Sequence, residues 1–378
     1  MSGIDQLLQA AADLEKIGVE AARAYNAAAD RMTVLVNRAL LDHPDLERLL
    51  GDNTFELFED NHHNHVRFMG EMLLNGGIDG LVASLPWVYR SYHNQGVDYD
   101  YFPIALRAWI EAIRAEIELP GRHTEAAQLI GLYRWLIDHH DAVIRLAEME
   151  SPHEHDRAGP WAGHYAEFFD RLRSRDHRAC REVCRAAVRE GATQADIFQY
   201  IVYPAMTAIG ELWEAGKIGV ADEHMSTAIV NNVVISLYTD APLPEYLGGV
   251  AVVATAPDEH HEMGAWMVAT CLELEGWNVI YLGSDLPADE IARAVVAHRA
   301  DLVALSVAMP FNVDAVRTTV ATIRRGPEPH PAIVIGGGAF VRYPHLIETV
   351  DADAYFADGR SAAEWARQFR QATPAEAT

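Results

Sequence analysis

The sequence predicts a multidomain α plus α/β protein: a helical N-terminal domain, a four-helix bundle and a C-terminal flavodoxin-like, doubly wound parallel sheet. Three observations support this fold class. From Gly249 onward, short β-branched runs alternate with amphipathic segments, as they do in successive βα units. Residues 161–240 show only helical periodicity. Residues 1–150 are also helical by pattern and richer in aromatic side chains. The 378 residues accommodate two or three such domains.

The C-terminal region has the most regular pattern. Buried parallel strands are predicted at residues 249–256, 277–283, 302–308, 332–338 and 354–359. The amphipathic stretches between them are expected to be helices. A doubly wound sheet binds ligands beyond the carboxyl ends of its strands. The loops after the first, third and fourth strands are therefore the expected binding region.

Two polar segments mark the expected domain boundaries. Residues 151–160, SPHEHDRAGP, follow the helical N-terminal region, and residues 240–248 carry two prolines, as interdomain linkers often do. We therefore expect domains at residues 1–150, 161–240 and 249–378.

The composition excludes several classes of protein. The sequence has 30 Lys+Arg against 55 Asp+Glu, a formal net charge of −25. Such an acidic surface repels phosphate backbones, so no direct nucleic-acid binding is expected. No run of about 18 apolar residues and no signal peptide is visible, which predicts a cytoplasmic protein without a membrane span. The three cysteines cannot form a disulfide framework; Cys180 and Cys184 are one helical turn apart and are expected to be buried.

A possible metal ligand follows the first predicted strand. The loop contains Glu259-x-His261-x-x-Gly264. A histidine there can reach over the strand ends toward a metal, while a carboxylate two residues earlier accepts the other ring N–H and fixes the tautomer. Gly264 would let a bulky cofactor approach the following helix. Taken alone, the same pattern fits a solvated polar pair.

Two further features lie at the same predicted edge of the sheet. Ser306 ends the third strand, and Gly336, Gly337 and Gly338 end the fourth. A small hydroxyl and a bare backbone leave space for a long ligand tail, although glycines there also suit an ordinary turn.

Together these residues resemble the cobalamin-binding domain, whose pattern is D-x-H-x-x-G, then S-x-L, then GG. The resemblance covers residues 249–372 and implies that His261 is the lower cobalt ligand. It implies cofactor contacts for Glu259, Gly264, Ser306, Gly336 and Gly337. Two positions depart from the pattern: Glu259 replaces the aspartate and retains the histidine-orienting role, and Ala308 replaces the leucine.

The bundle carries a second pattern, Trp213 followed after nine residues by Glu223-His224. A buried tryptophan and a capped helix start, with Asp222 as N-cap, would explain it structurally. Upstream of a cobalamin domain, however, W-x9-E-H resembles CarH-type photoreceptors. That resemblance implies that Trp213, Glu223 and His224 surround the upper adenosyl group of adenosylcobalamin, whose Co–C bond light breaks.

One position departs from the CarH pattern. In those proteins a histidine follows the tryptophan and becomes the second axial ligand after illumination, whereas here Glu214 follows. The bis-histidine illuminated state is therefore not expected in the same form. Water, or His224 after a local shift, is the hypothesis for the upper position.

The N-terminal region lacks the basic winged helix of CarH repressors and resembles globin-like sensor modules. It contains His62, His63, His65, His139 and His140 among its aromatic side chains. Such a helical pocket suits a tetrapyrrole, although a helical dimerisation domain with solvated histidines fits equally well. The whole arrangement resembles photocobilins, which pair cobalamin with a bilin and control partner enzymes. Residues 1–150 contain no cysteine, so biliverdin would bind noncovalently.

Three other functions remain open from the sequence. A corrinoid methyl carrier also pairs a bundle with a cobalamin domain, and an adenosylcobalamin mutase subunit would need a partner to supply its barrel. A response regulator gives no reason for the Glu259–His261 spacing. Neither a nucleophilic triad nor a phosphate loop is visible, so a photoreceptor is expected rather than an enzyme. We also expect a homo-oligomer and an unidentified downstream effector protein or enzyme.

Overall fold

The computed structural model describes residues 3–12, 14, 16–149, 159–240, 244–246 and 248–372 and divides into two compact units. The N-terminal unit comprises Met1–Pro152 with Glu214–Lys217, and the C-terminal unit comprises His153–Trp213 with Ile218–Thr378. Residues 151–158 of the first expected linker, and 241–243 and 247 of the second, lie outside the described residues. No helix in the described ranges is both long and apolar enough to cross a membrane.

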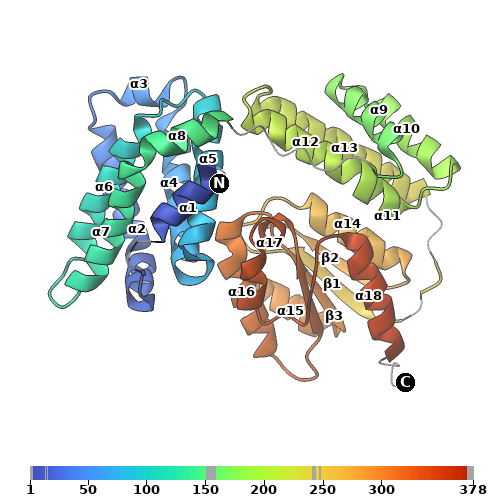
Figure 1. The fold of residues 1–378 in the computed structure, drawn as a ribbon. Helices are drawn as coiled ribbons and strands as arrows, with labels where there is room; N and C mark the ends of the chain where they lie inside the picture. Colours follow the sequence, from blue (N-terminus) through green and yellow to red (C-terminus); the bar gives the residue numbers. More distant parts are fainter. Residues whose placement is uncertain are drawn as a thin grey trace. The chain divides into compact units, whose positions relative to one another are not determined.

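The N-terminal unit is helical, as predicted. Its elements are α1 (Gly3–Ala11), α2 (Val19–Leu41), α3 (Leu46–Leu50), α4 (Phe55–Glu71), the π-helix η1 (Met72–Gly76), α5 (Gly77–Asn94), α6 (Tyr101–Glu116), α7 (His123–Asp138) and α8 (His140–Met149). Helix α2 packs against α4, α6 and α7 (Figure 1). Its alanines allow close helix approach, and Tyr25, Trp109 and Tyr133 are among the largest fully buried side chains. Aromatic burial therefore forms this core.

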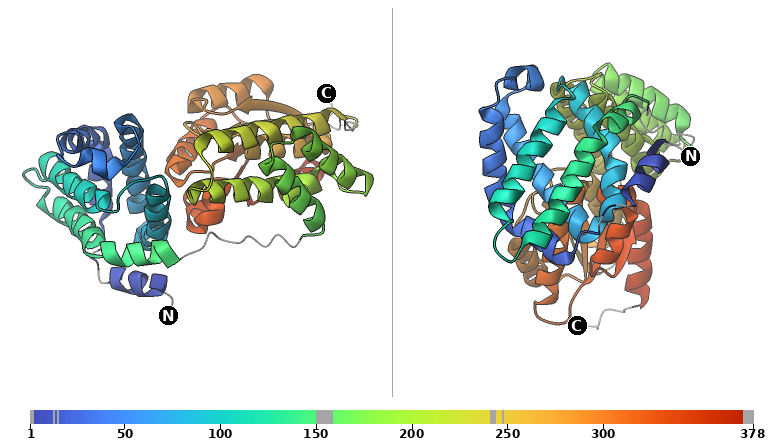
Figure 2. Two further views of the ribbon diagram at one scale, coloured as in Figure 1. Left: turned by 90° about the horizontal axis from the view of Figure 1, so that it is seen from above. Right: turned by 60° about the vertical axis from the view of Figure 1, so that its left-hand side comes forward.

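The predicted bundle is present as four helical segments. They are α9 (Ala162–Arg173), α10 (His177–Arg189), the continuous run α11 (Gln194–Ile197), η2 (Phe198–Val202) and α12 (Tyr203–Glu214), and α13 (Val220–Asp240). Figure 2 shows these green and yellow helices side by side. Cys180 and Cys184 are both buried in α10, as expected. Burial raises the pKa of the Cys180 thiol to about 11, so it packs as a neutral side chain.

The structure corrects the expectation that Asp222 is the N-cap of α13. Asp222 is not the N-cap, because α13 begins at Val220 and Asp222 lies within its first turn. There its carboxylate accepts a hydrogen bond from Gly219 N at 3.4 Å and pairs with Arg175 at 2.7 Å. A carboxylate in the first turn still favours the helix, because it faces the positive end of the helix dipole.

The C-terminal sheet has the predicted doubly wound topology. Its elements are β1 (Val250–Thr255), α14 (Met263–Leu274), β2 (Asn278–Gly283), α15 (Ala288–His298), β3 (Leu302–Ser306), η3 (Pro310–Asn312), α16 (Val313–Arg324), β4 (Ala332–Gly336), α17 (Gly338–Arg342), η4 (Pro344–Thr349), β5 (Ala354–Phe356) and α18 (Gly359–Ala372). The strands are parallel in the order β2-β1-β3-β4-β5, which is the flavodoxin order.

Helices cover both faces of this sheet. Helix α14 packs with α18 on one face, and α15 packs with α16 on the other (Figure 1). The bundle and the sheet domain share one hydrophobic core. Within it the Trp266 ring lies 5.9 Å from the Phe198 ring and 6.2 Å from the Tyr238 ring, measured between centroids. The bundle and the sheet therefore bury apolar surface together.

Candidate functional site

The strand register brings the predicted site residues to one edge of the sheet. Thr255 pairs with Ser306, Ser306 with Gly336, and Gly336 with Phe356. These four residues form one row at the carboxyl ends of β1, β3, β4 and β5. The order β2-β1-β3-β4-β5 also reverses direction at β1, so the loop after β1 lies at the switch point where such sheets bind ligands.

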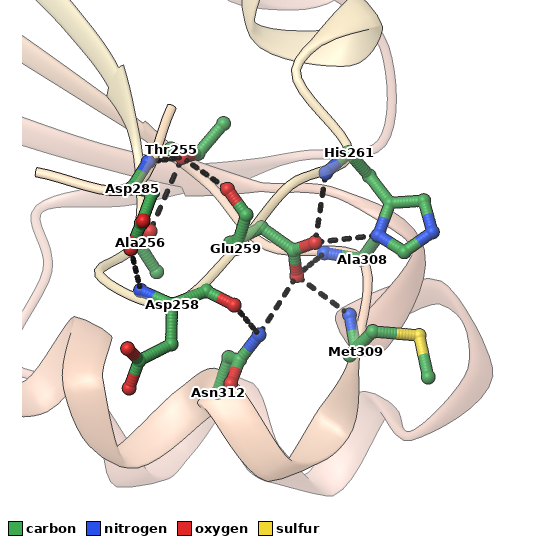
Figure 3. A network of polar contacts seen from close by, with 9 residues as sticks. All are labelled: Thr255, Ala256, Asp258, Glu259, His261, Asp285, Ala308, Met309 and Asn312. Carbon is green, nitrogen blue, oxygen red and sulfur yellow. Dashed lines mark hydrogen bonds and ion pairs between the residues drawn. The ribbon is translucent and has the colours of Figure 1, made fainter. Parts of the chain in front are cut away.

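The loop between β1 and α14 is tied down by its own backbone and by its neighbours. Thr255 Oγ1 donates to the carbonyl oxygen of Glu259 at 2.9 Å, and Asp258 N donates to Asp285 Oδ1 at 3.1 Å (Figure 3). Asn312 Nδ2 donates to the carbonyl oxygen of Asp258 at 3.0 Å. The loop therefore holds its conformation through contacts with three other segments, which pre-organises the side chains that it carries.

The Glu259 carboxylate is the centre of this network (Figure 3). Its side chain is 1% exposed. Oε1 accepts hydrogen bonds from His261 N at 3.0 Å and from His261 Nδ1 at 2.5 Å. Oε2 accepts from Ala308 N at 2.9 Å, Met309 N at 3.0 Å and Asn312 Nδ2 at 3.3 Å. Burial by itself would raise the pKa of Glu259, but these donors, with His261 foremost, lower it to about 2.

His261 is oriented by that carboxylate and remains accessible. Its side chain is 63% exposed. Because the ionised Glu259 can only accept, Nδ1 carries the proton, and in the neutral ring Nε2 keeps its lone pair. The hydrogen bond to Glu259 raises the pKa of His261, and the charges of Glu259 and Glu223 act in the same direction. A fixed tautomer with a free Nε2 is the state that a metal ligand requires.

The glycines at the end of β4 are required by the chain itself. A Cβ on Gly336 would lie 2.6 Å from the carbonyl oxygen of Phe356. One on Gly337, whose φ is +109°, would lie 2.2 Å from that of Val307. The close approach of the strand ends therefore explains both glycines. Gly264 differs, because a Cβ there would meet Ser306 Oγ at an ordinary 3.5 Å. Gly264 and Ser306 thus face each other across the edge.

The three bundle residues lie at one end of α12 and α13. Trp213 is partly buried near the end of α12. Thr227 Oγ1 donates to Glu223 Oε1 at 2.8 Å, and His224 Nδ1 lies 3.3 Å from Glu223 Oε2. The Glu223 side chain is 30% exposed, whereas that of His224 is 75% exposed. Because the charge of Glu223 acts on His261, the structure brings this end of the bundle within electrostatic range of the His261 loop.

The histidines of the N-terminal unit occupy different environments. His62 uses both ring nitrogens, with Nδ1 2.5 Å from Asn37 Oδ1 and Nε2 2.7 Å from the Tyr101 hydroxyl. His65 Nε2 lies 2.9 Å from the Tyr133 hydroxyl, and His63 is exposed. His62 and His65 both pack against Trp109, with ring centroids 6.3 and 4.9 Å away, so these two share one aromatic cluster while His63 lies outside it.

The pair near the end of α7 is separate. His139 stacks on Trp135 with ring centroids 4.1 Å apart, and its Nδ1 lies 2.9 Å from the Trp135 carbonyl oxygen. His140 Nδ1 lies 3.2 Å from the Tyr89 hydroxyl. The two adjacent histidines therefore contact different aromatic partners and do not act as a pair.

Two residues of the candidate site were missed by sequence reasoning. Asn312 is buried and donates to both Glu259 and the Asp258 carbonyl. Thr227 orients Glu223. Thr227 follows Glu223 by four residues on a helix, a spacing that brings side chains together and could have indicated this contact. Asn312 lies 53 residues after Glu259, so only the tertiary structure connects them.

The donor set suits a metal that arrives within a cofactor. Across the described residues no group of three or more His, Cys, Asp or Glu side chains is placed to hold a metal ion. His261 instead offers one nitrogen at a sheet edge where Gly264 and Ser306 have little or no side chain. One protein ligand plus an open edge fits a corrin-bound cobalt, whose equatorial ligands come from the cofactor itself.

Comparisons with known proteins agree with this geometry. Residues 249–366 match a family model described as the B12 binding domain, and residues 165–238 match a second model with the same description. The HTH-type transcriptional repressor CarH of Myxococcus xanthus is 34% identical over 142 residues, 38% of this chain and 47% of the repressor. CarA of the same organism is 32% identical over 123 residues, 32% of this chain and 42% of that repressor. The chain thus spans about half or less of each repressor.

Corrinoid proteins are also similar. Monomethylamine corrinoid protein 1 of Methanosarcina barkeri is 25% identical over 146 residues, 37% of this chain and 67% of that protein. The solved structure of the Methanosarcina barkeri monomethylamine corrinoid protein superposes with a TM-score of 0.50 at 20% identity, covering 55% of this chain and 99% of that one. It shows that the fold is shared. Together the matches support cobalamin binding and a likeness to CarH-type regulators.

Proposed function

We propose that this protein is a light sensor that binds adenosylcobalamin in its C-terminal unit. The observation that carries the proposal is the His261–Glu259 pair: a free Nε2 on a fixed tautomer at the switch point of the sheet, within electrostatic range of Glu223. Adenosylcobalamin would supply a cobalt–carbon bond that visible light cleaves.

The residues of the chain have separate roles in this proposal. His261 would bind the cobalt, and Glu259 holds its ring and tautomer. Gly264, Ser306, Gly336 and Gly337 border the space for the cofactor tail. Trp213, Glu223 and His224 would contact the adenosyl group. Loss of that group would remove contacts from one end of the bundle, so the bundle–sheet interface would be the two-state element that light biases.

The test is an absorbance spectrum of the protein loaded with adenosylcobalamin in the dark and again after green light. Loss of the alkylcobalamin band with the product still bound supports the photoreceptor. A spectrum that responds to light as the free cofactor does contradicts it.

Which group takes the upper position after illumination is a separate proposal. Because Glu214 stands where CarH-type proteins have histidine, water, or His224, which is 75% exposed, after a local shift, would take that position. A spectrum of the illuminated state that is unchanged in His224→Ala would leave water as the ligand.

A corrinoid methyl carrier is the second candidate function. The similarity to the monomethylamine corrinoid protein over 67% of that protein's length favours it. The Trp213, Glu223 and His224 group favours the larger adenosyl ligand, and residues 1–150 exceed what a minimal carrier needs. Preference for methylcobalamin over adenosylcobalamin in a binding competition would select the carrier.

We further propose a noncovalent biliverdin in the N-terminal unit, with the chain acting as a homo-oligomer on a downstream effector rather than as an enzyme. The absence of cysteine in residues 1–150 requires noncovalent binding. Biliverdin added to the purified protein is expected to show a shifted red band that survives desalting but not acid denaturation. A band identical to that of free pigment would leave dimerisation as the role of this unit.

A further inference from the structure

A groove of about 290 Å³ runs between α6 and α7 of the N-terminal unit. Its lining residues are Arg107, Ile110, Glu111, Arg114, Arg134 and Ile137. The two helices pack directly against each other and lie side by side in Figure 1. None of these residues contributes to the site at the sheet edge, so the groove is unexplained by the proposed function.

The groove concentrates positive charge on a strongly acidic chain. It contains three guanidinium groups and one carboxylate, whereas the whole sequence has a net charge of −25. Glu111 is already paired with Arg114 one turn later on α6. Within the described part of the chain, neither Arg107 nor Arg134 has a carboxylate at ion-pair distance. Two exposed positive charges therefore remain for an external anion.

The spacing of these charges defines the kind of anion. Arg107 and Arg114 are two helical turns apart on α6, a rise of about 10 Å, and Arg134 approaches from α7. Between them lie two isoleucines: Ile110, which is 6% exposed, and the partly exposed Ile137. The groove thus offers guanidinium donors spread along its length over an apolar floor. Guanidinium groups bind carboxylates bidentately, which favours planar oxyanions over simple halides.

We propose that this groove binds an amphiphilic dicarboxylate, with its apolar body on the isoleucines and its carboxylates on the unpaired Arg107 and Arg134, beside Arg114. A volume of about 290 Å³ lies at the small end of the roughly 300–1,000 Å³ of ligand pockets, which suits a small dicarboxylate. Two sources share this chemistry: a free aliphatic dicarboxylate, or the two propionates of a bilin. Only the second source rests on the proposed function.

The first test is calorimetric titration of the full-length protein with suberate, which has two carboxylates on a six-carbon chain. Octanoate, with one carboxylate, serves as the ligand control. The double variant Arg107→Gln/Arg134→Gln removes the unpaired charges. Arg23→Gln is the matched protein control, because Arg23 is exposed on α2 and paired with Glu20. Since all three positions are on the surface, thermal unfolding should be unchanged.

Suberate is expected to bind the wild type and Arg23→Gln equally, and the double variant at least about tenfold more weakly. Octanoate should bind about tenfold more weakly than suberate, and raised salt should weaken suberate binding. Suberate binding that is absent, or equal in the double variant, overturns the proposal.

The second test separates the two sources. Displacement of suberate by biliverdin but not by biliverdin dimethyl ester supports the propionates as the natural occupant. Suberate binding that biliverdin leaves unchanged supports a free dicarboxylate. If the wild type and the double variant bind biliverdin equally and neither binds suberate, the groove is not a dicarboxylate site. The proposed function would then remain intact.

Discussion

The histidines of the two units are held in opposite ways. His261 lies on an exposed loop with one ring nitrogen on a buried carboxylate and the other free. His62 is 2% exposed and uses both nitrogens on Asn37 and Tyr101. The Glu259 charge raises the pKa of His261, whereas burial without a counterion lowers the pKa of His62 to about 4.

This contrast separates a ligand from a core residue. A metal ligand needs a free lone pair, an oriented ring and an approach from solvent. His261 meets all three conditions, and His62 meets only the second. His65 resembles His62: burial lowers its pKa to about 3, and its Nε2 is hydrogen-bonded to the Tyr133 hydroxyl. The number of histidines in a segment therefore says less about ligation than the partner of each ring nitrogen.

The largest expected effect comes from removing the ligand itself. His261→Ala should weaken adenosylcobalamin binding by at least about 100-fold, because even second-shell changes cost 10- to 100-fold. A titration followed by absorbance measures this. The neighbouring His260→Ala is the control, since His260 is exposed and is expected to bind as wild type. Equal losses in both variants would remove the distinction between a ligand and a solvated histidine.

The next largest effect tests the carboxylate that orients the ring. Glu259→Gln keeps the shape but places an amide where up to five N–H donors converge, so cobalamin affinity should fall by about 10- to 100-fold. In Glu259→Asp the cobalamin affinity should fall less, because the shorter side chain keeps its negative charge. The exposed Glu262→Gln on the same loop is the control. Unchanged binding in Glu259→Gln would mean that His261 orients without its partner.

Mild acid should destabilise the N-terminal unit but not the His261 loop. The folded-state pKa values of His62 and His65 lie below the ordinary value near 6.5. Their contribution to stability is therefore present above pH 6.5 and is lost as the pH falls toward 4. Lowering the pH from 7 to 5.5 should reduce the folding stability by about 1 kcal/mol for each of these two histidines. His261 has a raised pKa, so its contribution is retained over the same range.

Hydrogen exchange at pH 7 and 5.5 measures this difference, after correction for the intrinsic pH dependence of exchange. Protection of α4 should fall while that of the β1–α14 loop holds. His62→Gln should reduce the pH dependence of α4. Parallel losses in both segments would contradict the contrast between the two histidine environments.

The smallest effect concerns the bundle end whose Glu223 charge acts on His261. Thr227→Val removes the hydroxyl that holds Glu223, which is worth about 1 kcal/mol or roughly fivefold. Adenosylcobalamin affinity should fall by that factor while methylcobalamin affinity stays constant. Thr227→Ser keeps the hydroxyl and should restore binding. Equal losses for both cofactors would assign Thr227 a structural role only.

Regular periodicity made the C-terminal fold predictable. Each predicted strand contains the observed one, and the row from Thr255 to Phe356 confirms the predicted meeting of strand ends. The two-residue spacing of Glu259 and His261 likewise anticipated their hydrogen bond, because a short loop segment leaves few other partners within reach. Local patterns sufficed where the interacting groups are neighbours in the chain.

Distant partners were beyond the reach of such patterns. Asn312 and the backbone N–H groups of Ala308 and Met309 reach Glu259 from a different loop. Nothing in their local sequence marks them as donors to a carboxylate about 50 positions earlier. The five N-terminal histidines show the same limit: His62 and His65 share an aromatic cluster around Trp109, His63 is exposed, and His139 and His140 contact other aromatic partners, which their clustering in sequence did not reveal.

The sequence by itself determined the parallel sheet, the helical segments and the identity of the His261–Glu259 pair, since these follow from hydrophobic period and short-range spacing. Only the tertiary structure decided which ring nitrogens are free, which donors bury the Glu259 carboxylate and where unpaired arginines converge on a groove. Those properties depend on burial and on contacts between segments far apart in the chain, which set the local dielectric and the hydrogen-bond partners of each group.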